Sequence, residues 1–268
     1  MLGTLLKYEF KAVGRILLPL FGAWLIAAAL LGLSIGGDGG QSVLFMALTA
    51  LLYGGVAMAA LILTTIILIQ RFYKNLLGNE GYLMFTLPVS TGQHIINKLL
   101  SASAWGTIGT VVAIASGILI AMTIEGPATL FEEIQFMVGD LQVVLGEGGI
   151  TFLLMLEMLV VIFLAFGVVG AKVYAAIAVG HQWSNHRIMG AIIAYIGFGI
   201  IETIIGNIVG AITDNSWFYT KLDSISMNMS TAGFASLVMF AGIIICAIVA
   251  AIYGFVSWKL LDKRLNLE

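Results

Sequence analysis

The sequence predicts an all-α membrane protein that crosses a bilayer six times. Of its 268 residues, 60% are hydrophobic and only 10% are charged, whereas soluble domains carry about 25% charged residues. Six apolar stretches reach about 20 residues or more, the length that a helix needs to cross the hydrocarbon core. These stretches are continuous, which excludes a membrane barrel, because barrel strands alternate between apolar and polar residues.

The first element precedes the spans. Residues 1–15 place apolar side chains at helical spacing among three cations, Lys7, Lys11 and Arg15. This pattern predicts an amphipathic helix that lies in the cytoplasmic interface of the membrane. A frayed polar lead-in is the alternative.

The spans follow at residues 16–35, 43–69, 99–124, 150–179, 188–212 and 232–258, in one transmembrane domain over residues 1–268. Four of them exceed the minimum length, so they should tilt or project beyond the bilayer. A signal peptide is the competing interpretation of the first span. That run lacks a clear cleavage site, however, and five more spans follow it.

The cations predict the orientation. Of the twelve lysines and arginines, eleven fall before the first span, after the sixth, or at the junctions that follow the second and fourth spans. Cytoplasmic loops are enriched in these residues, so both termini are expected in the cytoplasm. The opposite side holds only Lys221, among acidic residues. The net charge of −2 gives no electrostatic footprint for nucleic acid.

The segment 70–98 between the second and third spans is too polar to be embedded in lipid and too aromatic for a passive loop. It extends the second span as a helix through Phe72, Tyr73 and Lys74, turns at Gly78 and ends at Pro88. An exposed aromatic cluster rimmed by charge is typical of a protein docking site. The alternative is that these side chains fold back onto the protein's own helices.

On the outer side, residues 127–146 predict a second amphipathic helix in the outer interface, because one face is apolar and the other carries Glu132, Glu133 and Asp140. A re-entrant or loosely ordered loop is the alternative. In the last outer loop, Trp217, Phe218 and Tyr219 suit an aromatic belt at the interface.

With its six spans, its cationic first helix and the run FYKNLLGNEGYLMFTLPVS, the chain resembles the membrane subunit of a type-two ATP-binding cassette (ABC) exporter, as found in Gram-positive bacteria. The motif likeness covers about twenty residues, Phe72 to Ser90. The resemblance implies that this segment is a coupling helix seated in a groove of the ATPase subunit. The contact residues it implies are Phe72, Tyr73, Lys74, Asn79, Glu80, Gly81, Tyr82 and Phe85, with His181 and Arg187 in a smaller coupling element over residues 172–187.

The resemblance also implies partners and a location. They are two copies of an ABC ATPase, a second copy of this chain or a related paralogue, the bacterial plasma membrane, and amphipathic peptide cargo such as phenol-soluble modulins, lantibiotics or peptide antibiotics. No phosphate-binding G-x-x-x-x-G-K-[ST] motif occurs in the chain, so ATP and Mg²⁺ would be held by the partner.

Two acids lie within spans. Glu157 and Glu202 both fall in the expected outer half of the bilayer, with no basic residue expected at the same depth. A carboxylate there costs about 2.5 kcal/mol or more, so each should face protein or water. They either line a path that attracts cationic cargo, or are protonated and hydrogen-bonded between helices.

Glycines four residues apart allow helices to approach closely. Gly32 and Gly36 end the first span, and Gly206 and Gly210 end the fifth. In the family that the chain resembles, two permease copies meet through these spans, which implies a dimer interface at the glycines. Chance spacing is the alternative in a chain with 32 glycines.

No catalytic motif and no metal-ligand pattern is found in the sequence, since His181 and His186 have no cysteine or carboxylate nearby. The resemblance implies that the chain is the transmembrane subunit of an exporter of amphipathic peptides or hydrophobic compounds. The alternative is a membrane scaffold or sensor that recruits a cytoplasmic partner through residues 70–98.

Overall fold

The computed structural model describes residues 2–37, 42–74, 89–145, 148–183, 186–214 and 216–263, and this part of the chain contains helices and turns but no strand. In the described residues, six helices are long and apolar enough to cross a membrane, which agrees with the all-α class and with the predicted number of candidate spans. They are α1 (Leu2–Gly36), α2 (Val43–Phe72), α4 (Thr91–Glu125), α6 (Gly148–Gly180), α7 (Arg187–Thr213) and α9 (Thr231–Lys263). Two shorter helices are α5 (Pro127–Leu145) and α8 (Ser216–Asn228).

The surface of the long helices is apolar. In α2, Leu51 is 73% exposed, and in α7, Ile188 is 72% exposed. A water-soluble monomer rarely exposes apolar surface of this extent, whereas lipid chains cover such a surface without cost. Together with the helix lengths, this surface suggests a multi-pass membrane protein.

Local sequence explains several helix boundaries. Ser42 and Ser90 cap α2 and α4, where each hydroxyl accepts a hydrogen bond from the amide three residues later. Gly126 separates α4 from α5 with a φ of 87°, a backbone conformation that glycine adopts readily and other residues rarely do. Pro127 then starts α5, where its missing amide hydrogen leaves no helical bond unmade.

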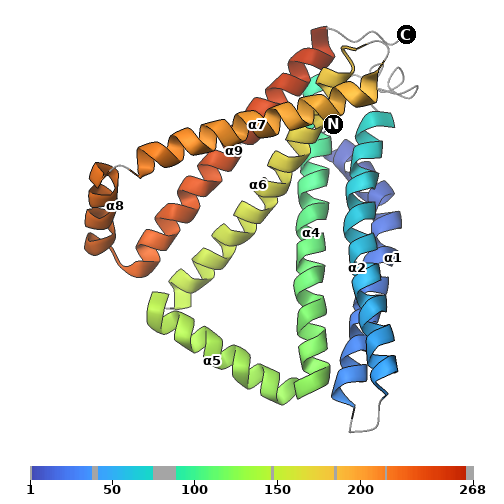
Figure 1. Cartoon of the computed structure of the whole chain (residues 1–268), viewed down its shortest axis with the longest axis vertical. Coiled ribbons are helices and arrows are strands. Elements are labelled where there is room, and N and C mark those ends of the chain that lie inside the picture. Colours follow the sequence, from blue (N-terminus) through green and yellow to red (C-terminus); the bar gives the residue numbers. More distant parts are fainter. Residues whose placement is uncertain are drawn as a thin grey trace.

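The helices form two groups of three, α1–α2–α4 and α6–α7–α9 (Figure 1). The first group has a core of large side chains around Phe21, Trp24 and Trp105. In the second, Tyr253 of α9 packs on the small residues Ala171 and Ala175 of α6. The groups are joined by α4, which packs on both α6 and α9.

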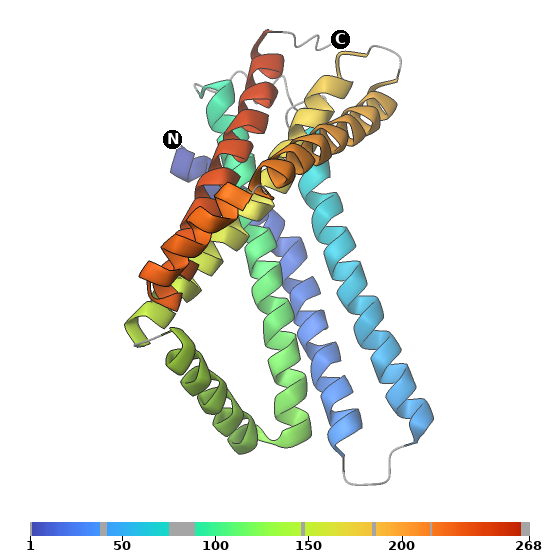
Figure 2. The same ribbon diagram turned by 60° about the vertical axis from the view of Figure 1, so that its left-hand side comes forward.

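The two groups meet at one end of the molecule and separate toward the other. In both views, α4 and α6 diverge away from their shared end, and α5 runs between their far ends (Figure 2). At the shared end, a third core cluster joins Phe72 of α2, Ile95 of α4, Tyr174 of α6 and Leu261 of α9. The strongest connection between the groups therefore lies at this end.

We call this end the basic end. There α2, α6 and α9 finish and α4 and α7 begin, and the hydroxyl of Thr91 donates to Asp262 across it. In the described part of the chain, every lysine and arginine except Lys221 of α8 lies in the half of its helix nearest this end. The helices thus gather the cations that are dispersed along the sequence.

Two features differ from the expected layout, and a third agrees with it in part. Helix α1 runs without a break from Leu2 to Gly36, so residues 1–15 do not form an element separate from the first span. The expected outer loop with Trp217 contains a helix, α8, which follows the most inclined long helix, α7 (Figure 1). Residues 127–146 are helical almost throughout, as α5, whereas their place in a membrane interface stays a prediction.

Candidate functional site

The candidate site is the group of helix ends at the basic end. Tyr73 and Lys74 follow α2, His181 follows α6, and Arg187 begins α7. The ring of Tyr73 meets the ring of His181 edge to face, with their centroids 5.3 Å apart. Residues from the two coupling segments implied by the resemblance, about 110 positions apart in sequence, are therefore neighbours.

Phe72 lies in the core and not on the surface where the resemblance implies an ATPase contact. Its side chain is fully buried and stacks on Tyr174 of α6, with the ring centroids 3.8 Å apart and the planes 4° from parallel. A buried ring cannot form part of a docking surface, so Phe72 belongs to the core that joins the two helix groups. The alternative of folding back onto the protein's own helices holds for this residue.

The centre of the expected coupling helix lies outside the described residues. This applies to Asn79, Glu80, Gly81, Tyr82 and Phe85. Their role as contacts for an ATPase stays a prediction. The structure does describe the two helix ends that flank them, at the end of α2 and the beginning of α4.

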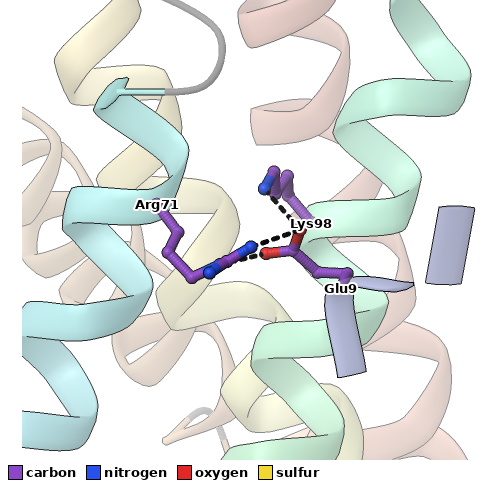
Figure 3. Close-up of polar contacts among 3 residues, drawn as sticks. All are labelled: Glu9, Arg71 and Lys98. Carbon is purple, nitrogen blue, oxygen red and sulfur yellow. Dashed lines mark hydrogen bonds and ion pairs between the residues drawn. The ribbon is translucent and has the colours of Figure 1, made fainter. Parts of the chain in front are cut away.

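These flanking helices are joined to α1 by a buried ion cluster (Figure 3). The carboxylate of Glu9 accepts a 2.8 Å hydrogen bond from Nε of Arg71 and forms a 2.8 Å ion pair with Nζ of Lys98. Arg71 Nη2 makes a further bond of 3.3 Å to the second carboxylate oxygen. One carboxylate thus binds a cation from α2 and another from α4.

The cluster is buried in spite of its charge. The exposed fractions of the side chains are 7% for Glu9, 3% for Lys98 and 26% for Arg71. Removing charges from water is costly, and the cost is recovered only where the geometry is good and the charges are paired. The two-pronged contact of Arg71 with Glu9 meets that requirement.

Glu9 is absent from the residues singled out by sequence. A signal for it does exist, since Glu9, Val13, Leu17 and Phe21 are spaced by four residues and form the buried face of α1. A lone acid on an otherwise apolar face predicts a buried partner. The sequence does not show which cations approach, because Arg71 lies 62 positions away.

A groove opens beside Tyr73 and His181. It has a volume of about 620 Å³ and lies between α2 and α7, with α6 at its base. Its apolar lining includes Val173, Ile188 and Ile192, whereas Gln70, Lys74 and Arg187 contribute polar and charged groups. Such a lining fits a molecule that is apolar along most of its length and polar at one end.

The histidine in this groove is kept neutral. Burial lowers the pKa of His181 below its ordinary value, and the charge of Arg187 lowers it further. A neutral ring at pH 7 avoids a third positive charge beside Lys74 and Arg187. It also permits the apolar contact with Tyr73.

The second intramembrane acid has a partner that was not expected. Lys172 of α6 donates to one oxygen of Glu202 in α7, and the hydroxyl of Tyr253 in α9 donates to the other at 2.6 Å. Lys172 lies eight residues from the end of α6, so Glu202 is nearer the basic end than its position in α7 predicts. The expectation that no basic residue shares its depth is wrong, because α7 crosses α6 obliquely.

Glu157 behaves differently. One of its oxygens accepts a 2.7 Å hydrogen bond from Ser236 of α9, whereas the other is buried without a hydrogen-bond partner among the described residues. This contact between helices agrees with the structural alternative for this acid. Its part in a cargo path stays a prediction.

The two glycine pairs have different surroundings. A Cβ atom at Gly32 would lie 2.9 Å from Cβ of Thr123 in α4, and one at Gly36 would overlap the Thr123 carbonyl oxygen. These glycines therefore allow α1 to approach α4 within one chain. In contrast, a Cβ at Gly206 or Gly210 would meet nothing within 4 Å, which leaves that face of α7 open.

No group of three or more His, Cys, Asp or Glu side chains in the described ranges could hold a metal ion. The basic end therefore offers ion pairs, packed aromatic rings and an apolar groove. Comparison of the chain with protein-family models, with curated proteins and with solved structures found no match.

Proposed function

We propose that the chain is the transmembrane subunit of an ABC-type exporter, in which a separate ATPase subunit binds ATP and Mg²⁺. The observation that carries the proposal is the meeting of Tyr73 and His181 at the basic end. Both residues belong to the segments that resemble coupling elements, and a partner that touches both would move both helix groups at once.

The ion cluster supports such a transmission. Residues 75–88 join α2 to α4, and Glu9 binds Arg71 at the end of α2 and Lys98 near the beginning of α4. A force on the joining segment would therefore act on α1, α2 and α4 together, since separating them would break the ion pairs of the buried Glu9 carboxylate. The turn between α6 and α7 would receive the same movement on the other side of the groove.

The orientation follows from the charges. Among the described residues, every lysine and arginine except Lys221 lies toward the basic end, so that end would face the cytoplasm, where the ATPase is found. The bilayer would be a bacterial plasma membrane. A second copy or a paralogue would complete a pathway, with the open face of α7 at Gly206 and Gly210 as a contact.

The cargo class follows from the groove between α2 and α7. Its apolar walls and its polar groups at Gln70, Lys74 and Arg187 suit an amphipathic peptide or a hydrophobic compound better than a small ion or a sugar. Movement of α2 relative to α7 would change the width of this groove and so couple it to ATP hydrolysis.

The test compares two charge reversals, Glu80→Lys in the joining segment and Glu132→Lys on the exposed face of α5. The tagged chain is co-expressed with the products of the adjacent reading frames and purified in mild detergent. We expect the wild type and Glu132→Lys to retain the ATPase, and we expect amphipathic peptides to stimulate its hydrolysis of ATP. Glu80→Lys should lose both properties.

Two results would contradict the proposal. In the first, the chain binds no ATPase with Walker A and signature motifs under conditions where it stays folded. In the second, it retains a partner that hydrolyses no ATP, which would favour a scaffold that recruits this partner through residues 70–98.

A further inference from the structure

A second groove at the basic end lies on the outside of the α1–α2–α4 group, away from α7. It has a volume of about 570 Å³ and is lined by Phe10, Lys11, Arg15, Leu18, Pro19 and Trp105. Five of these residues belong to the first half of α1, and Trp105 belongs to α4. The groove therefore crosses the expected boundary between the interfacial residues 1–15 and the first span.

The floor of this groove is aromatic and rigid. Phe10 stacks on Trp105 with the ring centroids 5.2 Å apart. At Gly14, α1 lies directly on the indole, because a Cβ there would be 3.1 Å from two of its ring carbons. Trp105 itself is 3% exposed, so the floor is fixed by packing inside the chain.

The face of α1 that borders the groove carries uncompensated positive charge, of which Lys11 and Arg15 belong to the groove and Lys7 lies beyond it. Lys7, Lys11 and Arg15 follow one another at intervals of four residues, which places them on one face of α1. Like charges at this spacing destabilise a helix. The acid of this segment, Glu9, is buried on another face with Arg71 and Lys98, and within the described residues none of the three exposed cations forms an ion pair.

Pro19 adds a polar group to the groove. Proline has no amide hydrogen, so the carbonyl of Arg15 lacks the donor that it would have in a regular helix. This carbonyl is an acceptor next to two cations, whereas Leu18, which is 61% exposed, continues the groove as an apolar wall.

We propose that this groove binds one anionic phospholipid from the leaflet at the basic end. The phosphate lies between Lys11 and Arg15, a headgroup hydroxyl donates to the Arg15 carbonyl, and the first carbons of an acyl chain lie along Leu18. The charge of the groove selects an anionic headgroup over a zwitterionic one. The hydroxyls of phosphatidylglycerol meet the free acceptor, and this lipid is therefore the probe of choice.

This site is independent of the proposed ATPase partner, and its test needs only the purified full chain. Native mass spectrometry measures the binding of phosphatidylglycerol and of phosphatidylcholine to the wild type and to two double variants. Lys11→Ala with Arg15→Ala removes both groove cations. Lys7→Ala with Lys259→Ala removes two exposed cations near the same end but outside the groove.

We expect one phosphatidylglycerol to bind the wild type in preference to phosphatidylcholine. The variant with Lys11→Ala and Arg15→Ala loses both cations that would face the lipid phosphate. Its binding of phosphatidylglycerol should therefore be weaker by about tenfold or more. The Lys7 and Lys259 variant should bind as the wild type does. Equal loss in both variants, or equal binding of the two lipids, would overturn the proposal and indicate diffuse attraction to any anionic surface.

A second measurement locates the lipid. Brominated phosphatidylglycerol quenches nearby indoles, so quenching of the wild type in vesicles is compared with quenching of Trp105→Phe. We expect the quenched fraction to fall in the variant, because the floor of the groove has lost its indole. Unchanged quenching would place the lipid elsewhere and overturn the assignment to this groove, whatever the mass spectrometry shows.

Discussion

The two helix groups are held together by different means. In α1–α2–α4, a nearly buried carboxylate binds two cations, and Gly32 and Gly36 allow α1 to lie against Thr123. In α6–α7–α9, the corresponding acid is Glu202, whose side chain is 40% exposed and which binds one cation and a tyrosine. The glycines of α7 face open space. The first group has the contacts of a rigid body, and the second has a helix, α7, that is packed on one side only.

Glu9→Gln is expected to lower the free energy of unfolding more than any of the other substitutions below. Removing this charge leaves Arg71 and Lys98 without their shared anion, and breaking a buried pair in this way costs about 3–5 kcal/mol of unfolding free energy. The midpoint of thermal unfolding in detergent should fall well below that of Glu132→Gln, which makes the same substitution on the exposed face of α5. Adding Lys98→Met to Glu9→Gln should recover part of the loss. Equal midpoints for Glu9→Gln and Glu132→Gln would show that the cluster does not hold this group.

The next effect tests the packing of the glycines. An added methyl group at Gly32 overlaps the Thr123 side chain, and overpacking of this kind costs about 1–3 kcal/mol. Gly32→Ala should lower the unfolding midpoint, whereas Gly206→Ala should leave the midpoint of the monomeric chain unchanged. If both variants unfold alike, the two groups do not differ in packing.

A smaller effect is expected for Glu202→Gln. The amide keeps a hydrogen bond with Tyr253 and loses the ion pair with Lys172, so one cation loses its anion where Glu9→Gln affects two. The measurement is again the unfolding midpoint, with Glu132→Gln as the control. A loss as large as that of Glu9→Gln would reverse the comparison of the two groups.

The smallest effect concerns pH. Because the folded protein lowers the pKa of His181, its contribution to stability is complete above the ordinary value of 6.5 and is lost as the pH falls through the lowered value. Wild-type midpoints should therefore fall more between pH 7.5 and pH 5 than those of His181→Gln. The exposed His186 provides a control substitution, His186→Gln, which should follow the wild type. Identical pH profiles for all three proteins would exclude a role of His181 in this dependence.

Much of the fold is predictable from the sequence because span length and apolarity are local properties. The expected spans 43–69 and 188–212 agree with α2 and α7 to within three residues at either end. The helix over 127–146 is likewise present as α5. Helix α8 was not predicted, since its residues are too polar for a span and too few for a clear periodic pattern.

The candidate site is less predictable, because it depends on which helices are neighbours. Sequence resemblance indicated Tyr73 and His181, and the structure brings their rings together. It also indicated Phe72, which is buried against Tyr174. Conversely, Glu9 is not among the predicted site residues, although its place on an apolar helix face indicates that a charged partner exists.

By itself the sequence determined that this protein is helical, that it has six stretches long and apolar enough to cross a membrane and that its cations collect at alternate junctions, because hydrogen bonding in lipid and the positions of charges act on short stretches of chain. Only the tertiary structure decided that Lys98 and Arg71 share Glu9, that Lys172 reaches Glu202, and that Gly32 faces Thr123. These pairs depend on helix tilt and packing, which are set by contacts between residues far apart in the chain.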